Sequence, residues 1–363
     1  MKQESPNLIT IVVPTFNRYP FLLRLLRYYG SFQFPFPMHV LDSSSDSLDD
    51  AELKELLRSP RVRHTAYDPE CSPVTKIAEG VKHVTTPYVV FWSDDDLLVP
   101  RSVDVAARFL EDHGDFSIAQ GQIARFTLDA VRGDWPSLNV SPFVQHSYTS
   151  RRACDRLLRF ASGSCSLFYS VYRAQNLRSI LEQCVEHGFG YYWSEMALAW
   201  LSVIDGKVKS LDTLYMFRHI HDARDTWREG SSWDCFDWVT SMKFPEKYAA
   251  FNACLSEALV RQDGISQGEA HQVVKQAFWS FLAGGLTRNG RWRYGWRATK
   301  WGGRLRRFVR ARPELLSASR RLRTFFPAGS RGMSVSTLKR AGSKYHEDFL
   351  PIYRAVMETK VSP

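Results

Sequence analysis

Short apolar runs alternate with amphipathic segments over the first hundred residues. Leu8–Val13 is apolar and rich in β-branched residues, and it ends at Pro14, which predicts a strand buried on both faces. Pro20–Tyr29 instead repeats its apolar residues at helical spacing before Gly30. The alternation continues with strands predicted over 38–41, 61–66 and 88–92 and with helices predicted over 48–57 and 73–84.

This order predicts right-handed βαβ units, and therefore an α/β fold in which helices flank a mostly parallel sheet. Polar clusters follow three of the predicted strands directly, at 15–18, 42–46 and 93–96. In a parallel sheet, ligands bind at the carboxyl ends of the strands. We therefore expect the three clusters to gather on one edge and to form a binding site there.

The pattern is less regular from about 115 to 235. It predicts strands over 116–119, 166–172 and 209–217, and helices over 174–184 and 194–203. From about 236 the pattern becomes helical. The sequence thus predicts a first domain over 1–235 and a helical, basic C-terminal region over 236–363.

Three adjacent carboxylates, Asp94, Asp95 and Asp96, close the apolar run Tyr88–Trp92. Such close carboxylates repel one another unless a cation or several donors offset their charge. Mg²⁺ and Mn²⁺ take carboxylate and diphosphate oxygens as ligands. The triplet is therefore predicted to be a site for a divalent metal and a nucleotide diphosphate. A solvated acidic loop that caps the next helix is the alternative.

The three blocks at 10–18, 40–46 and 88–100 resemble, in order and spacing, the family 2 type glycosyltransferases with a GT-A, Rossmann-like fold. The resemblance implies sugar transfer from a nucleoside-diphosphate sugar, which is the donor partner. It is specific over about the first 110 residues, weaker to about 230, and absent beyond.

Donor-binding roles follow from this resemblance. It implies that Pro14, Thr15 and Asn17 hold the nucleotide, and that Asp42 contacts the base, often uracil. The family usually has a second Asp directly after this position, where the present chain has Ser43. The resemblance also gives a diphosphate-facing role to Lys76, for which an ordinary surface lysine is the alternative.

The register of the metal motif is open. The family's common motif is Asp-x-Asp-Asp. In one register Ser93 takes the place of its first Asp, and Asp95 and Asp96 take the later positions. In the other register Asp94 and Asp96 are the Asp-x-Asp pair. On an extended segment, residues i and i+2 point the same way, so Asp94 and Asp96 would face one ligand. The expected metal ligands are Asp94 and Asp96, with Asp94 and Asp95 also contacting the donor.

Two residues beyond the triplet complete the expected site. In inverting relatives the catalytic base is a carboxylate at the start of a helix, and Glu195 stands in the matching segment, followed by Met196 where the family has a second acid. Stabilisation of the helix dipole is the alternative role for Glu195. His221, after a predicted strand, is expected from the resemblance to approach the metal, Mn²⁺ or Mg²⁺, or the diphosphate, in preference to His219 on the same face. A surface loop is the alternative.

Composition adds one local feature. The formal net charge is +10, but the segment 287–324 alone holds 13 Lys or Arg and one acid, so its net charge of 13 − 1 = +12 leaves the rest of the chain near −2. Arginine alternates with aromatic residues there. This favours an anionic membrane surface, through 288–323, or a polyanionic acceptor, and it disfavours nucleic acid, because no known nucleic-acid module accompanies the segment.

The remaining composition indicates the compartment. The six cysteines form no CxxC pair, no apolar window reaches about 18 residues, and the first residues do not look like a signal peptide. A cytoplasmic enzyme is expected, peripheral on the inner face of the membrane and acting on a glycan or glycolipid in polysaccharide biosynthesis. The alternatives are a nucleotide-sugar-binding scaffold without activity and, less favoured, a nucleotidyltransferase.

Overall fold

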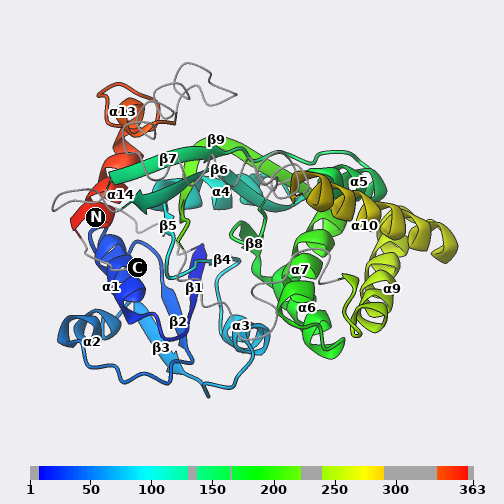
Figure 1. Cartoon of the computed structure of the whole chain (residues 1–363), viewed down its shortest axis with the longest axis horizontal. Coiled ribbons are helices and arrows are strands. Elements are labelled where there is room, and N and C mark those ends of the chain that lie inside the picture. The colour runs from blue at the N-terminus through cyan, green and yellow to red at the C-terminus, as the bar shows by residue number, and fades with distance from the viewer. Residues whose placement is uncertain (1–7, 130–136, 164–165, 222–238, 290–332, 359–363) are drawn as a thin grey trace, which may run out of the picture.

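Figure 1 shows the computed structural model, which describes residues 8–129, 137–163, 166–221, 239–289 and 333–358. Within these residues, nine strands form one sheet in the order β3-β2-β1-β4-β8-β6-β9-β5, with β7 paired to β6. Helices cover the sheet, and two hydrophobic cores form between the sheet and these helices. The predicted α/β class is confirmed.

The first half follows the predicted βαβ order. Its elements are β1 (Ile9–Thr15), α1 (Tyr19–Gly30), β2 (Met38–Asp42), α2 (Ala51–Leu57), β3 (Val62–Ala66), α3 (Pro73–Lys82) and β4 (Tyr88–Phe91). The strands pair in parallel, β1 with β2 and β4, and β2 with β3. Helix α3 begins where the sequence predicts, because the Ser72 hydroxyl accepts a hydrogen bond from the Thr75 amide.

The second half departs from a mostly parallel sheet. Its elements are β5 (Leu97–Leu98), α4 (Pro100–Asp112), β6 (Phe116–Asp129), β7 (Ser137–Phe143), α5 (Ala153–Ser162), β8 (Val171–Arg173), α6 (Ala174–Glu186), α7 (Tyr191–Asp205) and β9 (Lys207–His219). Strand β8 pairs antiparallel with β4 and β6, whereas β6 and β9 run parallel. The predicted mostly parallel sheet is therefore right for β3-β2-β1-β4 and too simple for the other strands.

The C-terminal helices pack on both cores. They are α9 (Phe244–Asp263), α10 (Gln267–Asn289), α13 (Val335–Leu338) and α14 (His346–Glu358). Helices α9 and α10 pack against α5, and α9 also packs against α7. Helix α14 lies against α1 and places the Phe349 ring 5.3 Å from Phe217 of β9.

Two predictions fall on segments that the structure does not describe. The proposed domain boundary at 235 falls within 222–238, and nearly all of the basic segment 288–323 falls within 290–332, both outside the described residues. No helix among the residues that are described is long and apolar enough to cross a bilayer.

Candidate active site

The ends of β1 and β2 meet at one edge of the sheet, as the sequence predicts. Pro14 and Thr15 close β1, and Thr15 stands opposite Asp42 at the end of β2. Asn17 then adopts a left-handed backbone conformation with φ of 51°, which asparagine tolerates better than most residues. This conformation orients both its amide groups toward the loop that follows β2.

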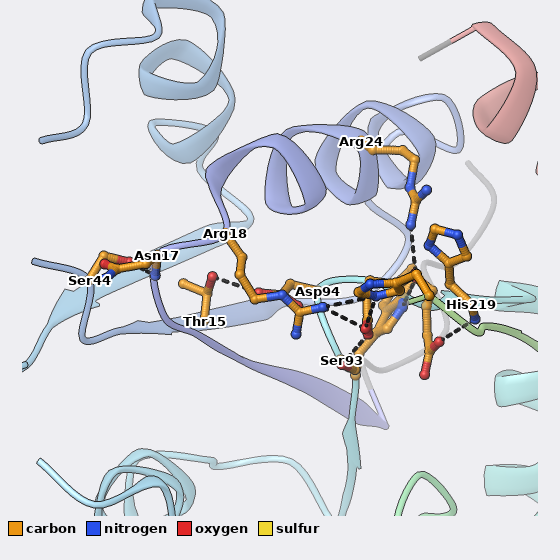
Figure 2. Close-up of polar contacts among 12 residues, drawn as sticks. Thr15, Asn17, Arg18, Arg24, Ser44, Ser93, Asp94 and His219 are labelled. Atoms are coloured by element: carbon orange, nitrogen blue, oxygen red, sulfur yellow. Dashed lines mark hydrogen bonds and ion pairs between the residues drawn. The ribbon is translucent and has the colours of Figure 1, made fainter. Parts of the chain in front are cut away.

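Asn17 joins the two loops through several hydrogen bonds. Its backbone N–H donates to the Ser44 hydroxyl over 2.8 Å, and its side-chain Nδ2 donates to the Ser45 hydroxyl over 3.0 Å. Its Oδ1 accepts from the amides of Ser45 (2.8 Å) and Asp46 (3.2 Å). Figure 2 shows this contact between Asn17 and Ser44. The nucleotide loop predicted from the sequence is thus a single linked unit.

Asp42 is held on both of its carboxylate oxygens. Oδ1 accepts from the Ser44 amide over 2.9 Å, while Oδ2 accepts from the Tyr19 hydroxyl and lies 3.1 Å from His64 Nε2. Burial alone would raise the pKa of Asp42. The hydrogen bonds from His64 and Ser44 outweigh burial and hold the pKa below its ordinary value.

Lys76 lies at the same edge but points into the protein. Its Nζ donates to the Thr15 carbonyl over 2.8 Å and to the Ser43 hydroxyl over 2.7 Å, and only 3% of the residue is exposed. Burial lowers its pKa to about 8. In this structure Lys76 ties the end of β1 to the end of β2, whereas the sequence predicts a diphosphate-facing lysine.

The acidic triplet follows β4 at the same edge and is buried. Asp94, Asp95 and Asp96 are 2%, 7% and 2% exposed. Arg18 bridges two of them, because its Nη1 lies 3.2 Å from Asp94 Oδ1 and its Nη2 lies 2.6 Å from Asp95 Oδ2. Figure 2 shows Arg18 reaching from the start of α1 to Asp94, whose other oxygen accepts from the Thr15 hydroxyl.

The remaining contacts of the triplet lead to β9 and to the residue after it. Asp95 accepts from the Ser93 hydroxyl and lies 2.9 Å from Nε2 of His221. Asp96 accepts from the backbone amide of His219 over 2.7 Å. His221 stacks on the Phe21 ring, with centroids 4.9 Å apart.

The expected pairing of Asp94 and Asp96 is not observed. The segment is a turn, in which the Asp96 amide donates to the Ser93 carbonyl, so the alternation of an extended strand does not apply. Asp94 and Asp95 therefore share Arg18, and Asp96 turns toward β9. The triplet lies at the predicted sheet edge, and its turn conformation differs from the extended segment that the sequence predicts.

Burial and partners separate the pKa values of the three carboxyls. Burial raises the pKa of Asp94 to about 6 despite Arg18, and it raises the pKa of Asp96 well above its ordinary value. Burial acts on Asp95 in the same direction, but the hydrogen bond from His221 and the charge of Arg18 hold the Asp95 pKa below its usual range. Asp95 is the member that the structure keeps charged.

The predicted metal ligands do not converge on one point. Asp94 contacts Arg18 and Thr15, Asp96 contacts the His219 amide, and His221 contacts Asp95. No group of three or more His, Cys, Asp and Glu side chains in the described part of the chain is arranged to hold a metal ion. The residues predicted for Mn²⁺ or Mg²⁺ do not fit such an ion in this arrangement.

Glu195 lies in the first turns of α7 in an apolar pocket. The pocket is lined by Glu195 together with Val74, Ile77, Phe168, Leu181, Ser194 and Leu198. Burial raises the pKa of Glu195, and the charge of Arg218 opposes this rise. No hydrogen bond or ion pair joins the Glu195 carboxyl to another described residue.

Arg218 of β9 connects the two acidic sites electrostatically. Its guanidinium lies 5.6 Å from the centre of the Tyr169 ring, and its charge acts on both Asp96 and Glu195. No Asp or Glu oxygen of the described residues comes within 4.0 Å of its guanidinium nitrogens. Neither Arg18 nor Arg218 was predicted for the site, although Arg18 directly follows Asn17 and Arg218 stands three positions before His221.

One family of known proteins matches the part of the chain that holds these loops. Residues 10–181 match Glycosyl transferase family 2, and Glu195 and His221 lie beyond the match. Among solved structures, S. aureus TarS 1–349 in complex with UDP-GlcNAc is 15% identical, with 78% of this chain and 74% of that chain covered and a TM-score of 0.47. Another S. aureus TarS structure is 14% identical, with 76% and 54% covered and a TM-score of 0.37. A comparison with curated proteins finds no match.

The TarS likenesses are too distant to say anything about the chemistry of this chain. The family match is different, because its residues include the loop around Asn17, the loop around Asp42 and the acidic triplet. With these loops on one edge of an α/β sheet, residues 10–181 form a domain of the glycosyl transferase family 2 type, and the chain is a glycosyltransferase.

Proposed function

We propose that this chain transfers a sugar from a nucleoside-diphosphate donor, uridine-linked, to a hydroxyl of a glycan or glycolipid. One observation carries the proposal: the loops after β1, β2 and β4 form a single hydrogen-bonded edge, through Asn17 with Ser44 and through Thr15 with Asp94. Such an edge is where a parallel sheet binds nucleotides. The match of residues 10–181 to glycosyl transferase family 2 supports the same assignment.

The nucleotide side of this edge is preorganised. Asn17 fixes the two loops, and Asp42 is held in place by Tyr19, His64 and Ser44. A fixed carboxylate at the end of β2 can accept the N3–H of a uracil ring, which is the basis for the proposed uridine donor. Pro14 and Thr15 would lie beside the ribose, as the family resemblance implies.

Glu195 is proposed as the catalytic base. A carboxylate with a raised pKa and no protein partner among the described residues is suited to take a proton from an acceptor hydroxyl. In the proposed step the hydroxyl oxygen bonds to the anomeric carbon, the bond from that carbon to the diphosphate breaks, and the hydroxyl proton moves to Glu195. Attack from the face opposite the leaving group inverts the anomeric centre.

Arg218 is proposed to receive the negative charge of the leaving diphosphate. Its guanidinium acts on Asp96 and on Glu195, so it lies in range of both the donor edge and the base. A guanidinium held in place before the reaction stabilises developing phosphate charge without rearranging. No step of this scheme passes through a metal ion, since the predicted metal ligands do not converge.

A nucleotide screen tests the proposal. We expect UDP to raise the thermal midpoint of the full chain more than GDP or CDP does, and UDP-sugars to release UDP faster when acceptor is added. Asn17→Ala should weaken the stabilisation by UDP, because it removes the side-chain hydrogen bonds to Ser45 and Asp46 that join the two loops. Asn176→Ala is the matched control, since Asn176 lines a separate pocket beside Pro87 and Tyr88, at the start of β4.

Two results would contradict the proposal. If no nucleotide raises the thermal midpoint, the donor site is not at this edge. If UDP binds but no sugar is transferred from any UDP-sugar to any glycan or glycolipid acceptor, the proposed donor and acceptor classes are wrong. The acceptor and a peripheral position at the membrane stay predictions from the sequence, because 290–332 lies outside the described residues.

A further inference from the structure

The carboxylate oxygens of the acidic triplet are already occupied by donors of the protein. Both oxygens of Asp94 are contacted, by Arg18 and Thr15, and both oxygens of Asp95 are contacted, by Ser93 and by Arg18 with His221. One oxygen of Asp96 accepts from a backbone amide. Five of the six oxygens therefore have a protein donor or cation.

Arg18 is held firmly in this position. Its guanidinium contacts two carboxylates at once, a geometry that a planar fork of N–H groups provides and that a lysine ammonium does not. It also lies 4.9 Å from the centre of the Phe21 ring, and its Nη2 lies 3.3 Å from Nε2 of His221. Carboxylates, an aromatic face and an imidazole thus surround one cation.

A second guanidinium adds positive charge to the same edge. Arg24 of α1 is fully buried and donates from Nη2 to the Asp95 carbonyl over 2.6 Å. Figure 2 shows it reaching the triplet from the α1 side. Six buried side-chain nitrogen or oxygen atoms have no partner among the described residues, and five of them are nitrogens of Arg18, Arg24, His219 and His221.

The negative charge of the acidic triplet is offset by arginine side chains of the protein itself. Arg18 contacts the carboxylates of Asp94 and Asp95, Arg24 contacts the Asp95 backbone carbonyl, and the charge of Arg218 acts on Asp95 and Asp96 from β9. A divalent cation that approached Asp94 or Asp95 would have to displace Arg18 and would meet the charge of Arg24. Like charges that lie close together in a buried site repel each other strongly.

We propose that Arg18 is the resident cation of the acidic triplet, in the place that the sequence assigns to a divalent metal, and that sugar transfer by this chain runs without Mn²⁺ or Mg²⁺. The part that concerns transfer rests on the proposed function. The part that concerns Arg18 and the triplet does not. The experiment separates the two.

Direct Mn²⁺ binding tests the first part. Titration calorimetry of the full chain, with and without UDP, is compared between wild type and Arg18→Ala. The variant should bind Mn²⁺ at least about tenfold more tightly, or about 1.4 kcal/mol, because it frees carboxylate oxygens and removes one positive charge. Arg27→Ala is the control, since Arg27 lies on α1, which Arg18 directly precedes, but forms an exposed ion pair with Glu52; this variant should bind Mn²⁺ as wild type does.

Arg18→Lys covers the case in which the alanine variant does not fold. Lysine keeps the charge but reaches only one carboxylate, so Mn²⁺ binding should still be tighter than in wild type. Wild type that binds Mn²⁺ as tightly as the Arg18 variants, with or without UDP, overturns the proposal.

Transfer in EDTA tests the second part. Wild type should keep its transfer rate within about twofold after EDTA treatment, a barrier change of less than about 0.5 kcal/mol. Transfer that stops in EDTA and returns with Mn²⁺ overturns the inference while the proposed function stands. If wild type transfers sugar under no condition, the proposed function fails, and the Mn²⁺ titrations still decide the role of Arg18.

Discussion

The acidic triplet after β4 is buried and Glu195 of α7 is half-buried, and the two sites have opposite surroundings. Asp94 and Asp95 are bridged by Arg18, and Asp95 also contacts His221. Glu195 lies among apolar side chains, with no ion pair to a described residue. Partners hold the pKa of Asp95 below its usual range, whereas burial without a partner among the described residues raises the pKa of Glu195 and leaves that carboxyl free to exchange a proton.

Replacing the unpartnered carboxyl should have the largest effect. Glu195→Gln keeps the shape and removes the base, so kcat should fall about 10²–10⁴-fold while stabilisation by UDP is unchanged. Steady-state kinetics with a thermal-shift titration measure both quantities. Glu186→Gln at the exposed end of α6 should leave both unchanged. A loss of less than tenfold in Glu195→Gln would end the assignment of this residue as base.

Arg218 lies between the two sites, and its replacement should have the next largest effect. Arg218→Gln should lower kcat about 10²-fold, because one fixed donor to the leaving group is lost. Arg218→Lys should recover part of this loss, since it restores the charge. The control is Lys209→Gln, which removes a cation from the same strand beside Phe109. Equal rates in Arg218→Gln and in Lys209→Gln would show that Arg218 does not act on the reaction.

Breaking the partnered site should act mainly on stability. Asp95→Ala leaves Arg18 and His221 without their shared carboxylate, and the free energy of unfolding should fall by about 3 kcal/mol. Urea denaturation measures this change. Asp104→Ala breaks the exposed pair with Arg108 and should cost less than about 1 kcal/mol. If the two variants lose the same amount, the triplet is not held by its buried partners.

The smallest effect concerns the pH dependence of stability. Because burial raises the pKa of Glu195 above its ordinary 4.5, the folded chain binds this proton more tightly than the unfolded chain. The stability that this group contributes is fully present below pH 4.5 and is lost as the pH rises through the raised pKa of the folded chain. At pH 8, Glu195→Gln removes the cost of the buried charge. The thermal midpoint should therefore rise by about 2–4 °C for each kcal/mol by which the free energy of unfolding increases. Below pH 4.5 the difference should disappear, and a difference that persists there would have another cause.

Local patterns predicted the first half of the chain well. Apolar runs ended by Pro or Gly, and caps such as Ser72 before Pro73, lie within a few residues of one another, so they are visible in the sequence. The expectation that the polar clusters meet at one edge was right for the same reason, since β1, β2 and β4 are parallel neighbours.

Long-range pairing limited the prediction of the second half. Strand β6 extends to Asp129, well beyond the predicted 116–119, because β7 and β9 supply partners along its length. Strand β7 and helix α5 were not predicted. The predicted strand over 166–172 is reduced to Val171–Arg173, where β4 and β6 offer partners on both sides.

The residue pattern along the chain is enough to assign the α/β class, the strand-end loops and the types of residue at the site. How those residues are used depends on contacts between distant parts of the chain. The tertiary structure turned Asp96 away from Asp94, directed Lys76 to the Thr15 carbonyl, and brought Arg18 and His221 to Asp95 from positions 77 and 126 residues away. The physical reason is that the charge state of a buried carboxyl depends on its partners in space, which a one-dimensional pattern does not contain.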